Sequence, residues 1–462
     1  MLTLKQVAQW CDGSVAPEFA NLEITGVSTD TRTIQPGELF IALQGDSFDG
    51  HIFVRQALEK GAGAVMTHKQ MGPGVPAVFV DDTLEALGAL ARGYRASHGC
   101  CVIGITGSVG KTTTKEMIAD ILATTYRTCR TQGNHNNNVG LPLSILQIEP
   151  DCEMAVMEMG MNHFREMSYL TSIARPNVAL INNIGTMHIE HLGSREGILS
   201  AKMEILEGLM PNGETIFNGD EPLLWNQREQ LSKKPVYFGI ENPACDVTAT
   251  NIVQADGGMY FRVIGGGQEF DVFVPAEGMH IVYDALAAVT VGLVEHVRPE
   301  RIQSALSRFR NTGSRQSIYE KGGYTIIEDC YNAGPESMKA ALGVLAEHGG
   351  EGRRIAVLGD MLELGTCSIA EHYRLGRLAA ENADIVYAYG PHSDRVVIGA
   401  VTGGINNKST ARFDTHEEMA SMLRRTAKPG DTLLFKGSRG MKMETVLKLF
   451  LEGKGGNSHD EP

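Results

Sequence analysis

The sequence predicts an α/β protein with three domains: a small N-terminal α/β domain, a central domain with a mostly parallel sheet, and a C-terminal Rossmann-like, doubly wound domain. Two observations support this prediction. Strand and helix patterns alternate from residue 100 onward, and a second alternating series begins near residue 324. The predicted domains cover residues 1–97, 98–312 and 313–462.

The N-terminal domain is predicted from short elements. Apolar runs at 39–43 and 77–80 indicate strands, and helical patterns cover 53–60 and 84–97. No residue in this part of the sequence stands out as a nucleophile.

The central domain is predicted from longer strands and helices. The strands lie at 100–105, 154–160, 177–184 and 214–218, and the helices at 111–126 and about 196–209. A polar, turn-rich region at 242–268 indicates a β excursion before a helix from about 280 to 295. Because this alternation gives parallel strands, we expect ligands at their carboxyl ends.

The C-terminal domain repeats the alternation. Strands are predicted at 324–329, 354–359, 384–389 and 431–436, and helices at 336–348, 369–381, 416–426 and 441–452. The Gly-rich, polar tail at 453–462 is expected to be disordered.

Composition excludes several classes of function. The net charge of −14 and the absence of dense basic stretches argue against a nucleic-acid partner. No run of about 18 apolar residues is present, so we expect no membrane span. The 8 cysteines form no Cys-x-x-Cys pair, and no apolar signal region follows the N-terminus, which fits a reducing cytoplasm. We expect a monomer.

The glycine-rich turn of residues 104–116, Gly-Ile-Thr-Gly-Ser-Val-Gly-Lys-Thr-Thr-Thr-Lys-Glu, follows an apolar strand and opens a helix. This is a variant phosphate loop (P-loop), because Ile105 stands where the first glycine is usual. Gly107 and Gly110 allow the tight turn, Lys111 can reach the β- and γ-phosphates, and Thr112 can bind Mg2+. Ser108 and Thr113 belong to the same cradle. The loop predicts nucleoside triphosphate chemistry, the alternative being an ordinary strand-to-helix turn.

Other polar residues fall near the same sheet edge. Glu158 ends a predicted strand, and His188 follows the next one, so both can join Thr112 around a cation. A lone histidine is more often structural. Lys202 alone reads as a solvated helix lysine. The cluster of Asn134, Asn136 and Asn137 either forms turns or binds substrate.

Several of these stretches together resemble the Mur ligase family over nearly the whole chain. The residues that carry the resemblance are 106–117, 133–140, 158–163, His188 with 192–194, 201–204, 329–337, 358–365 and 436–439. The Tyr-Asn-Ala-x-Pro stretch at 331–335 and the Gly-Asp-Met-Leu-Glu-Leu-Gly stretch at 359–365 indicate the branch that adds D-alanyl-D-alanine.

The resemblance implies an ATP-dependent ligase. It would phosphorylate the terminal carboxylate of a UDP-N-acetylmuramoyl-tripeptide, and the amine of D-alanyl-D-alanine would then attack the acyl phosphate. It also implies Mg2+ held by Thr112 and Glu158, and a second Mg2+ held by His188 and a carbamylated Lys202. Lys111, Lys202 and His188 would be catalytic.

The resemblance further assigns binding residues. The uridine diphosphate end would meet Thr31, Arg32, Asp49 and His51 of the N-terminal domain. Arg315 and Asp329 would contact ATP when the last domain closes about a hinge near 311–314. Asn332 would lie near the nucleotide or the dipeptide.

Three residues depart from the family pattern. Asp284 replaces an asparagine that contacts adenine, and an ionised carboxylate cannot donate to a ring nitrogen. Gly334 stands where Asn is common, and Arg165 where Gly is common.

Two alternatives stay open at this point. A related Mur ligase or a folylpolyglutamate-synthase-like enzyme would add a single amino acid instead. A P-loop switch module would hydrolyse ATP to move domains, but this leaves Lys202, His188 and the third domain without a role.

Overall fold

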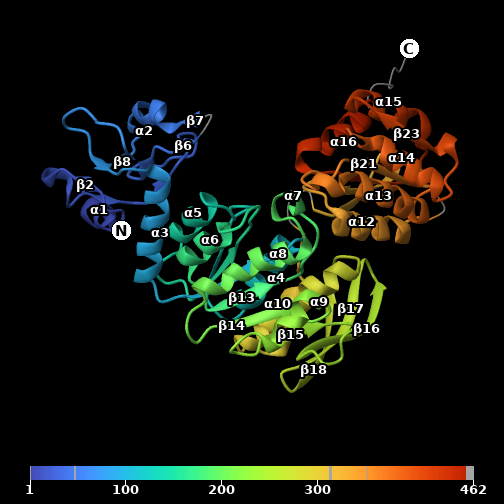
Figure 1. Cartoon of the computed structure of the whole chain (residues 1–462), viewed down its shortest axis with the longest axis horizontal. Helices are drawn as coiled ribbons and strands as arrows, with labels where there is room; N and C mark the ends of the chain where they lie inside the picture. The colour runs from blue at the N-terminus through green and yellow to red at the C-terminus, as the bar shows by residue number, and fades with distance from the viewer. Residues whose placement is uncertain (1, 46–47, 312–314, 351, 454–462) are drawn as a thin grey trace, which may run out of the picture.

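A computed structural model describes residues 2–45, 48–311, 315–350 and 352–453. Three lobes follow one another along the chain, each built on its own main sheet (Figure 1). The predicted α/β class and three-domain organisation are confirmed by this architecture and by its match to solved structures described below. The boundary at 312/313 and the tail from 454 fall outside the described residues, and the exact domain limits stay predictions.

The N-terminal lobe contains a five-stranded sheet in the order β2-β9-β8-β5-β4, parallel except for β2. Its elements are β1 (Leu2–Thr3), α1 (Leu4–Trp10), β2 (Ser14–Val15), β3 (Glu23–Ile24), β4 (Val27–Ser28), β5 (Leu39–Ile41), β6 (Gln44–Gly45), β7 (Phe48–Asp49), α2 (Val54–Glu59), β8 (Ala64–Thr67), β9 (Ala77–Phe79) and α3 (Thr83–Ser97). Strand β8, fully buried, was not predicted.

Helix α3 connects this lobe to the central one. It begins where the Asp82 carboxylate accepts hydrogen bonds from two backbone N–H groups, which satisfies the first turn. At its other end, Arg95 donates to the backbone oxygen of Ala174 at 2.8 Å. Tyr94 likewise donates to the backbone oxygen of Ile148 at 2.6 Å. The helix therefore packs on both lobes.

The central lobe contains a nine-stranded sheet in the order β11-β12-β10-β13-β14-β15-β16-β17-β18. It is parallel from β11 to β16, and the predicted β excursion forms antiparallel β16–β18. The strands are β10 (Cys101–Thr106), β11 (Thr128–Arg130), β12 (Met154–Glu158), β13 (Val178–Ile181), β14 (Glu214–Asn218), β15 (Val236–Gly239), β16 (Val247–Ala255), β17 (Gly258–Gly265) and β18 (Gln268–Val274). The α-helices are α4 (Lys111–Ala123), α5 (Gly140–Leu146), α6 (Glu166–Ala174), α7 (Ile189–Leu192), α8 (Arg195–Met203), α9 (Pro222–Trp225), α10 (Met279–Val294) and α11 (Pro299–Leu306).

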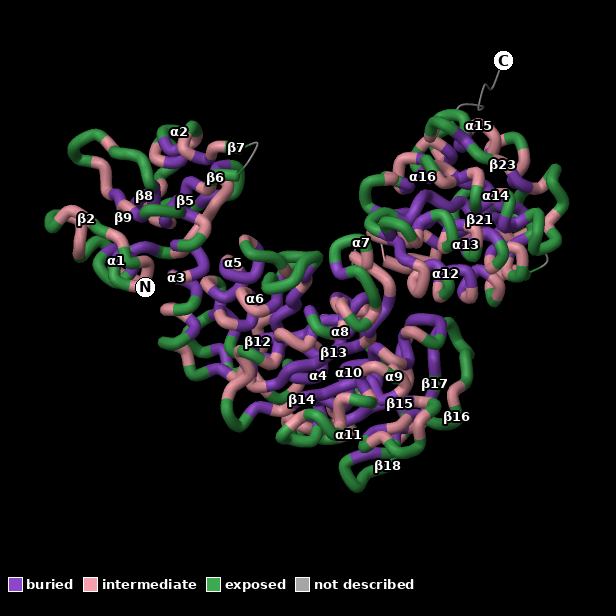
Figure 2. The backbone as a smooth tube through the Cα atoms, in the orientation of Figure 1, coloured by how far each residue is buried: buried purple, intermediate pink, exposed green. Residues whose placement is uncertain are grey.

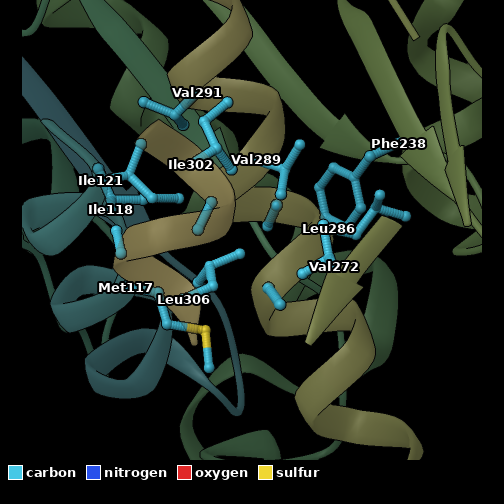
Figure 3. Close-up of a cluster of buried hydrophobic side chains, with 14 of the residues drawn as sticks. Met117, Ile118, Ile121, Phe238, Val272, Leu286, Val289, Val291, Ile302 and Leu306 are labelled. Atoms are coloured by element: carbon cyan, nitrogen blue, oxygen red, sulfur yellow. The ribbon is translucent and has the colours of Figure 1, made fainter. Parts of the chain in front are cut away.

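Two apolar cores cover the two faces of this sheet. In one, Met117, Ile118 and Ile121 of α4 pack with residues of α10 and α11 (Figure 3). These three α4 side chains are fully buried. The other core contains residues of α5, α6 and α8. Each fully buried Ile or Leu contributes about 1.5–3 kcal/mol, so burial on both faces (Figure 2) fixes the sheet that carries the phosphate loop.

The C-terminal lobe contains a six-stranded sheet in the order β19-β20-β24-β21-β22-β23, parallel except for β19. Its elements are β19 (Ser317–Lys321), β20 (Tyr324–Asp329), α12 (Pro335–Glu347), β21 (Arg354–Gly359), α13 (Ser368–Asn382), β22 (Ile385–Tyr389), α14 (Ser393–Thr402), β23 (Thr410–Phe413), α15 (His416–Thr426), β24 (Thr432–Lys436) and α16 (Met443–Glu452). Separate cores under α12–α13 and α15–α16 confirm the doubly wound prediction, to which the structure adds α14 and β23.

Among the residues that the structure describes, none of the helices combines the length and apolar character needed to cross a bilayer.

Candidate active site

The carboxyl ends of three central strands meet beside the phosphate loop. Ile105 of β10 lies opposite Glu158 of β12, and Thr106 lies opposite Ile181 of β13. Since the loop continues directly from β10, Glu158 and the residues after β13 are brought to its two sides. The strand pairing thus places the residues as the sequence predicts.

A cavity of about 1380 Å³ lies at this edge. It is lined from all three lobes, α3 of the N-terminal lobe included. The predicted site residues that line it are Ser108, Gly110, Lys111, Thr112, Thr113, Asn134, Asn136, Asn137, Glu158, His188, Asp284, Arg315, Asp329 and Asn332. Gly107, Lys202 and the four predicted N-terminal residues do not line it.

The phosphate loop is held by a side chain that the sequence analysis missed. Asn183 Oδ1 accepts from the backbone N–H groups of Ser108 and Val109, both at 3.0 Å. Gly110 begins α4 with φ of 80°, a left-handed conformation that glycine adopts without a steric penalty. Gly107 lies over Asn182, whose Cβ is 3.0 Å from the position a Cβ would take.

Lys111 bends back onto its own loop. Its Nζ donates to the backbone oxygens of Gly107 at 2.8 Å and Ser108 at 3.3 Å. Burial lowers the pKa of Lys111, and the Arg315 charge adds to this, while Glu158 opposes it. A cation with two carbonyl partners at the phosphate loop is available to anionic oxygens that enter the cavity.

Glu158 is the centre of a buried polar cluster. Its Oε2 accepts from the Thr112 hydroxyl at 2.7 Å, and its Oε1 accepts from Asn136 Nδ2 at 2.8 Å. Lys115, fully buried on α4, has its Nζ 4.0 Å from Glu158 Oε2. The same ammonium donates to the backbone oxygens of Thr131 and Gly133. A hydroxyl and a carboxylate oxygen in contact are ligands that Mg2+ prefers, so the donor set fits this ion.

His188 also lines the cavity, but its ring contacts the C-terminal lobe. Its Nδ1 is 2.5 Å from Glu363 Oε2 of the C-terminal lobe. Both residues have positive φ, 65° and 62°, which is uncommon outside glycine and costs energy. Among the described residues, no three His, Cys, Asp or Glu side chains gather at metal-binding distance. The predicted second cation site, of His188 and a carbamylated Lys202, stays a prediction.

Lys202 is buried. The sequence pattern alone predicts a solvated helix lysine, and this prediction is wrong, since only 2% of the residue is exposed. It follows Ile198 by four positions on α8 and so shares that residue's buried face. No hydrogen bond or ion pair joins its amine to the rest of the described chain. Burial, with a smaller contribution from the Lys111 charge, lowers the pKa of Lys202 well below its usual value.

Asp284 lies on the other flank of α4. Its Oδ1 accepts from the Thr114 hydroxyl at 3.0 Å, and Thr114 in turn accepts from Asn182 Nδ2 at 2.7 Å. Burial raises the pKa of Asp284 to about 8, although Thr114 and Arg315 oppose the shift.

In the C-terminal lobe, Asp329 and Arg315 each contact another side chain of the same lobe. Lys436 Nζ donates to Asp329 Oδ2 at 2.5 Å and to the backbone oxygen of Asn332 at 3.0 Å. The Arg315 guanidinium stacks 4.0 Å from the centre of the Tyr331 ring. Gly334 packs on Met187, because an added Cβ would lie 2.7 Å from Met187 Cγ.

The predicted N-terminal residues form a separate group. Asp49 contacts His51 Nδ1 at 2.7 Å and Lys69 Nζ at 2.6 Å, and these partners hold the pKa of Asp49 well below its usual range. His51 packs against His68 with the two rings tilted by 56°, and its Nε2 is buried without a hydrogen-bond partner in the described chain. Thr31 donates to Gln56, and the exposed Arg32 pairs with Asp30.

Sequence reasoning missed Lys115, Asn183, His68, Lys69 and Tyr331 as site neighbours. Lys115 stands in the predicted helix four residues after Lys111, and Asn183 directly follows a predicted strand. The available signals were the position of Asn183 at a strand end and that of Lys115 one helical turn after Lys111. His68 and Lys69 carry no comparable pattern.

Three α/β lobes around a phosphate loop, with a buried carboxylate beside the loop threonine, define a P-loop nucleotide-binding protein. Residues 105–292 match the Mur ligase middle domain, 314–439 the Mur ligase glutamate ligase domain, and 23–95 the Mur ligase catalytic domain. The chain belongs to the Mur ligase family.

One relative and two solved structures indicate which Mur ligases the chain is similar to. The chain is 40% identical over 457 residues to the UDP-N-acetylmuramoyl-tripeptide–D-alanyl-D-alanine ligase of Bacillus subtilis, covering 97% of this chain and 98% of the relative. It superposes on a crystal structure of MurF from Acinetobacter baumannii with a TM-score of 0.89 and 33% identity, covering 97% and 98% of the two chains. MurF from Thermotoga maritima in complex with ADP matches with a TM-score of 0.81 and 30% identity, covering 93% and 98%.

Proposed function

We propose that this protein joins D-alanyl-D-alanine to a UDP-N-acetylmuramoyl-tripeptide, using ATP, in the synthesis of peptidoglycan precursors. The observation that carries the proposal is the buried contact of Thr112 with Glu158 beside the phosphate loop, in a chain that aligns end to end with ligases of this name. The full-length similarity favours this branch over ligases that add one amino acid. It also accounts for the third lobe, which a simple ATPase switch would not need.

The first step is phosphoryl transfer to the peptide. The terminal carboxylate attacks the γ-phosphorus, an O–P bond forms, and the bond to the β-phosphate oxygen breaks to release ADP. Lys111 leaves its loop carbonyls and neutralises charge on the β- and γ-phosphates, and the N-terminus of α4 adds its backbone N–H groups. The loop is held ready for this by Asn183.

The second step forms the amide. The amine of D-alanyl-D-alanine attacks the acyl carbon, inorganic phosphate leaves, and the amine loses its protons to solvent or a nearby base. Arg315, Asp329 and Asn332 meet the nucleotide and the dipeptide from the C-terminal lobe. Closure of that lobe excludes water from the reactive acyl phosphate.

Thr112 and Glu158 would hold Mg2+, which screens the phosphate charges when bound. His188 and a carbamylated Lys202 would hold a second ion. Burial favours the neutral form of the Lys202 amine, and only a neutral amine reacts with CO2 to form a carbamate. Lys202 therefore has the chemistry that this modification needs.

The N-terminal lobe would bind the UDP end through Thr31, Arg32, Asp49 and His51. The unpartnered Nε2 of His51 and the ammonium of Lys69 suit an anionic, hydrogen-bonding ligand. The proposal includes the domain limits 1–97, 98–312 and 313–462, a monomer, and a cytoplasmic location, the last supported by eight free cysteines.

Phosphate release over a matrix of substrates tests the proposal. The acceptors are UDP-N-acetylmuramoyl-dipeptide and tripeptides ending in lysine or meso-diaminopimelate, and the amines are D-alanyl-D-alanine and single amino acids. We expect phosphate release only when a tripeptide, D-alanyl-D-alanine and ATP are all present. Release with the dipeptide and a single amino acid would contradict the proposal, and so would release from ATP alone at the full rate.

A further inference from the structure

The backbone N–H groups of the phosphate loop are in two different states. Those of Ser108 and Val109 both donate to Asn183 Oδ1 at 3.0 Å, and the Ser108 N–H also donates to the Asn183 backbone oxygen at 3.3 Å. In contrast, the N–H groups of residues 110–113 have no hydrogen-bond partner in the described part of the chain. The loop therefore divides into a part that the protein occupies and a part that is open to a ligand.

Asn183 uses both ends of its carboxamide to hold the occupied part. It lies two residues after the end of β13 at Ile181, and Ile181 is paired with Thr106, the last residue of β10 before the loop. While its Oδ1 accepts from the loop, its Nδ2 donates to the Val109 backbone oxygen at 3.1 Å. A carboxamide is the side-chain group that offers an acceptor and a donor side by side. The loop is thus tied to the strand end in one orientation.

Other polar groups of residues 107–109 are also used within the protein. The Ser108 hydroxyl oxygen accepts from the Gly185 N–H at 2.8 Å. The backbone oxygens of Gly107 and Ser108 accept from Lys111 Nζ. Lys111 has a flexible side chain that turns to the phosphates in the proposed first step, whereas Gly185 belongs to the segment after β13. The hold from that segment is therefore independent of Lys111.

The occupied N–H groups limit where phosphates can bind. Successive backbone N–H groups that converge on one oxygen form an anion-binding concavity. At Ser108 and Val109 this concavity is filled by a neutral amide oxygen, so a phosphate oxygen cannot enter it. Phosphate oxygens are directed instead to the free N–H groups of residues 110–113 at the start of α4, where Lys111 also lies. The amide oxygen thereby sets the position of the phosphates relative to the groups that act on them.

We propose that Asn183 is a positioning residue for phosphoryl transfer. Its carboxamide closes the first pair of loop N–H groups and so fixes where the β- and γ-phosphates lie along the loop. Asn183 acts through Ser108 and Val109, whose N–H groups it holds. The inference rests on the proposed use of ATP.

The Asn183→Leu variant tests this role. Leucine is similar in size but has neither an acceptor nor a donor, so the nucleotide itself must order the loop, and this ordering costs binding free energy. We expect the KM for ATP to rise about tenfold and kcat to fall about a hundredfold, since a misplacement of about 1 Å is enough for such a loss. The KM for D-alanyl-D-alanine should stay within about twofold of the wild-type value. Steady-state phosphate release by the full chain measures all three constants.

Asn177 offers a matched control at the other end of the same two strands. It directly precedes β13, and its Oδ1 accepts from the Val102 N–H of β10 at 2.9 Å, as Asn183 Oδ1 accepts from the loop after β10. Asn177→Leu should therefore lower stability to urea by an amount similar to that of Asn183→Leu. Its KM for ATP should stay within about twofold of the wild-type value, because the loop keeps its hold. The comparison separates a loss of stability from a loss of positioning.

The Asn183→Asp variant continues the test if the leucine variant does not fold. Aspartate keeps the acceptor for both loop N–H groups but turns an oxygen toward the Val109 carbonyl, so the loop shifts and the KM for ATP should rise about tenfold. A folded variant of Asn183 with the wild-type KM for ATP would overturn the inference, and so would an Asn177→Leu variant with the same rise. A wild type that releases no phosphate from ATP with its proposed substrates would instead contradict the ATP-dependent function, so the two failures are distinguishable.

Discussion

The central and C-terminal lobes face the same cavity with polar groups in different states. In the central lobe, Thr112, Asn136 and Lys115 surround the buried Glu158 and hold it in place. In the C-terminal lobe, Asp329 is paired with Lys436, and Arg315 rests on Tyr331. The phosphate side is thus organised without a ligand, whereas the proposed closure would require the groups of the C-terminal lobe to exchange partners.

This difference has a physical basis. The central cluster is built on adjacent strands and one helix of a single sheet, so its geometry is fixed by folding. His188 contacts Glu363 across the two lobes, and the region at 312–314 that joins them is outside the described residues. Contacts between lobes are the ones that ligands can rearrange.

We expect the largest effect on turnover from a substitution in the phosphate loop of the central lobe. Lys111→Ala should lower kcat by about a hundredfold or more, because the ammonium neutralises charge that builds on the transferring phosphate. Steady-state phosphate release measures this. Lys234→Ala, an exposed lysine of the same lobe, is the matched control and should retain activity. Near-normal turnover of Lys111→Ala would remove the phosphate loop from the mechanism.

Lys202→Ala should lower turnover by about a hundredfold if its carbamate holds the second cation, which stabilises charge by several kcal/mol. Short-chain carboxylic acids should restore part of the activity, since they can replace the missing anion. Bicarbonate should also stimulate the wild type. An intact-mass measurement that finds an unmodified lysine in fully active enzyme would rule this role out.

The Lys115→Met variant tests whether the buried cluster around Glu158 depends on the Lys115 ammonium. Lys115→Met should lower the free energy of unfolding by about 2 kcal/mol, because the backbone oxygens of Thr131 and Gly133 lose their donor. Urea unfolding measures the change. A Lys115→Arg variant keeps the charge and should lose less, and an unfolding energy unchanged in Lys115→Met would show that the cluster does not stabilise the fold.

The Arg315→Ala variant tests the proposed closure of the C-terminal lobe. An ATP analogue with the tripeptide substrate should reduce the radius of gyration in solution scattering, and Arg315→Ala should weaken that response and slow turnover about tenfold, the value of one charge-assisted contact. Identical scattering with and without saturating ligands would contradict closure.

The sequence predicted the parts whose signals are local. The phosphate loop, the alternation of strands and helices, and the strand end at Glu158 can all be recognised in short stretches of the sequence. The burial of Lys202 cannot, because it depends on which face of α8 meets the sheet. Arg165, the residue before helix α6, has a left-handed φ of 72°, and its backbone N–H donates to Glu204, far along the chain. The Asn183 contact with the loop is equally remote in sequence.

An acyl phosphate between the two steps can be detected by an isotope-labelling experiment. A tripeptide substrate whose terminal carboxylate carries 18O is turned over with ATP and D-alanyl-D-alanine, and the released phosphate is examined by mass spectrometry. Because the carboxylate oxygen that attacks phosphorus leaves with the phosphate, we expect one 18O atom in each phosphate formed from fully labelled substrate. Phosphate without 18O, formed in step with the amide product, would contradict an acyl phosphate intermediate.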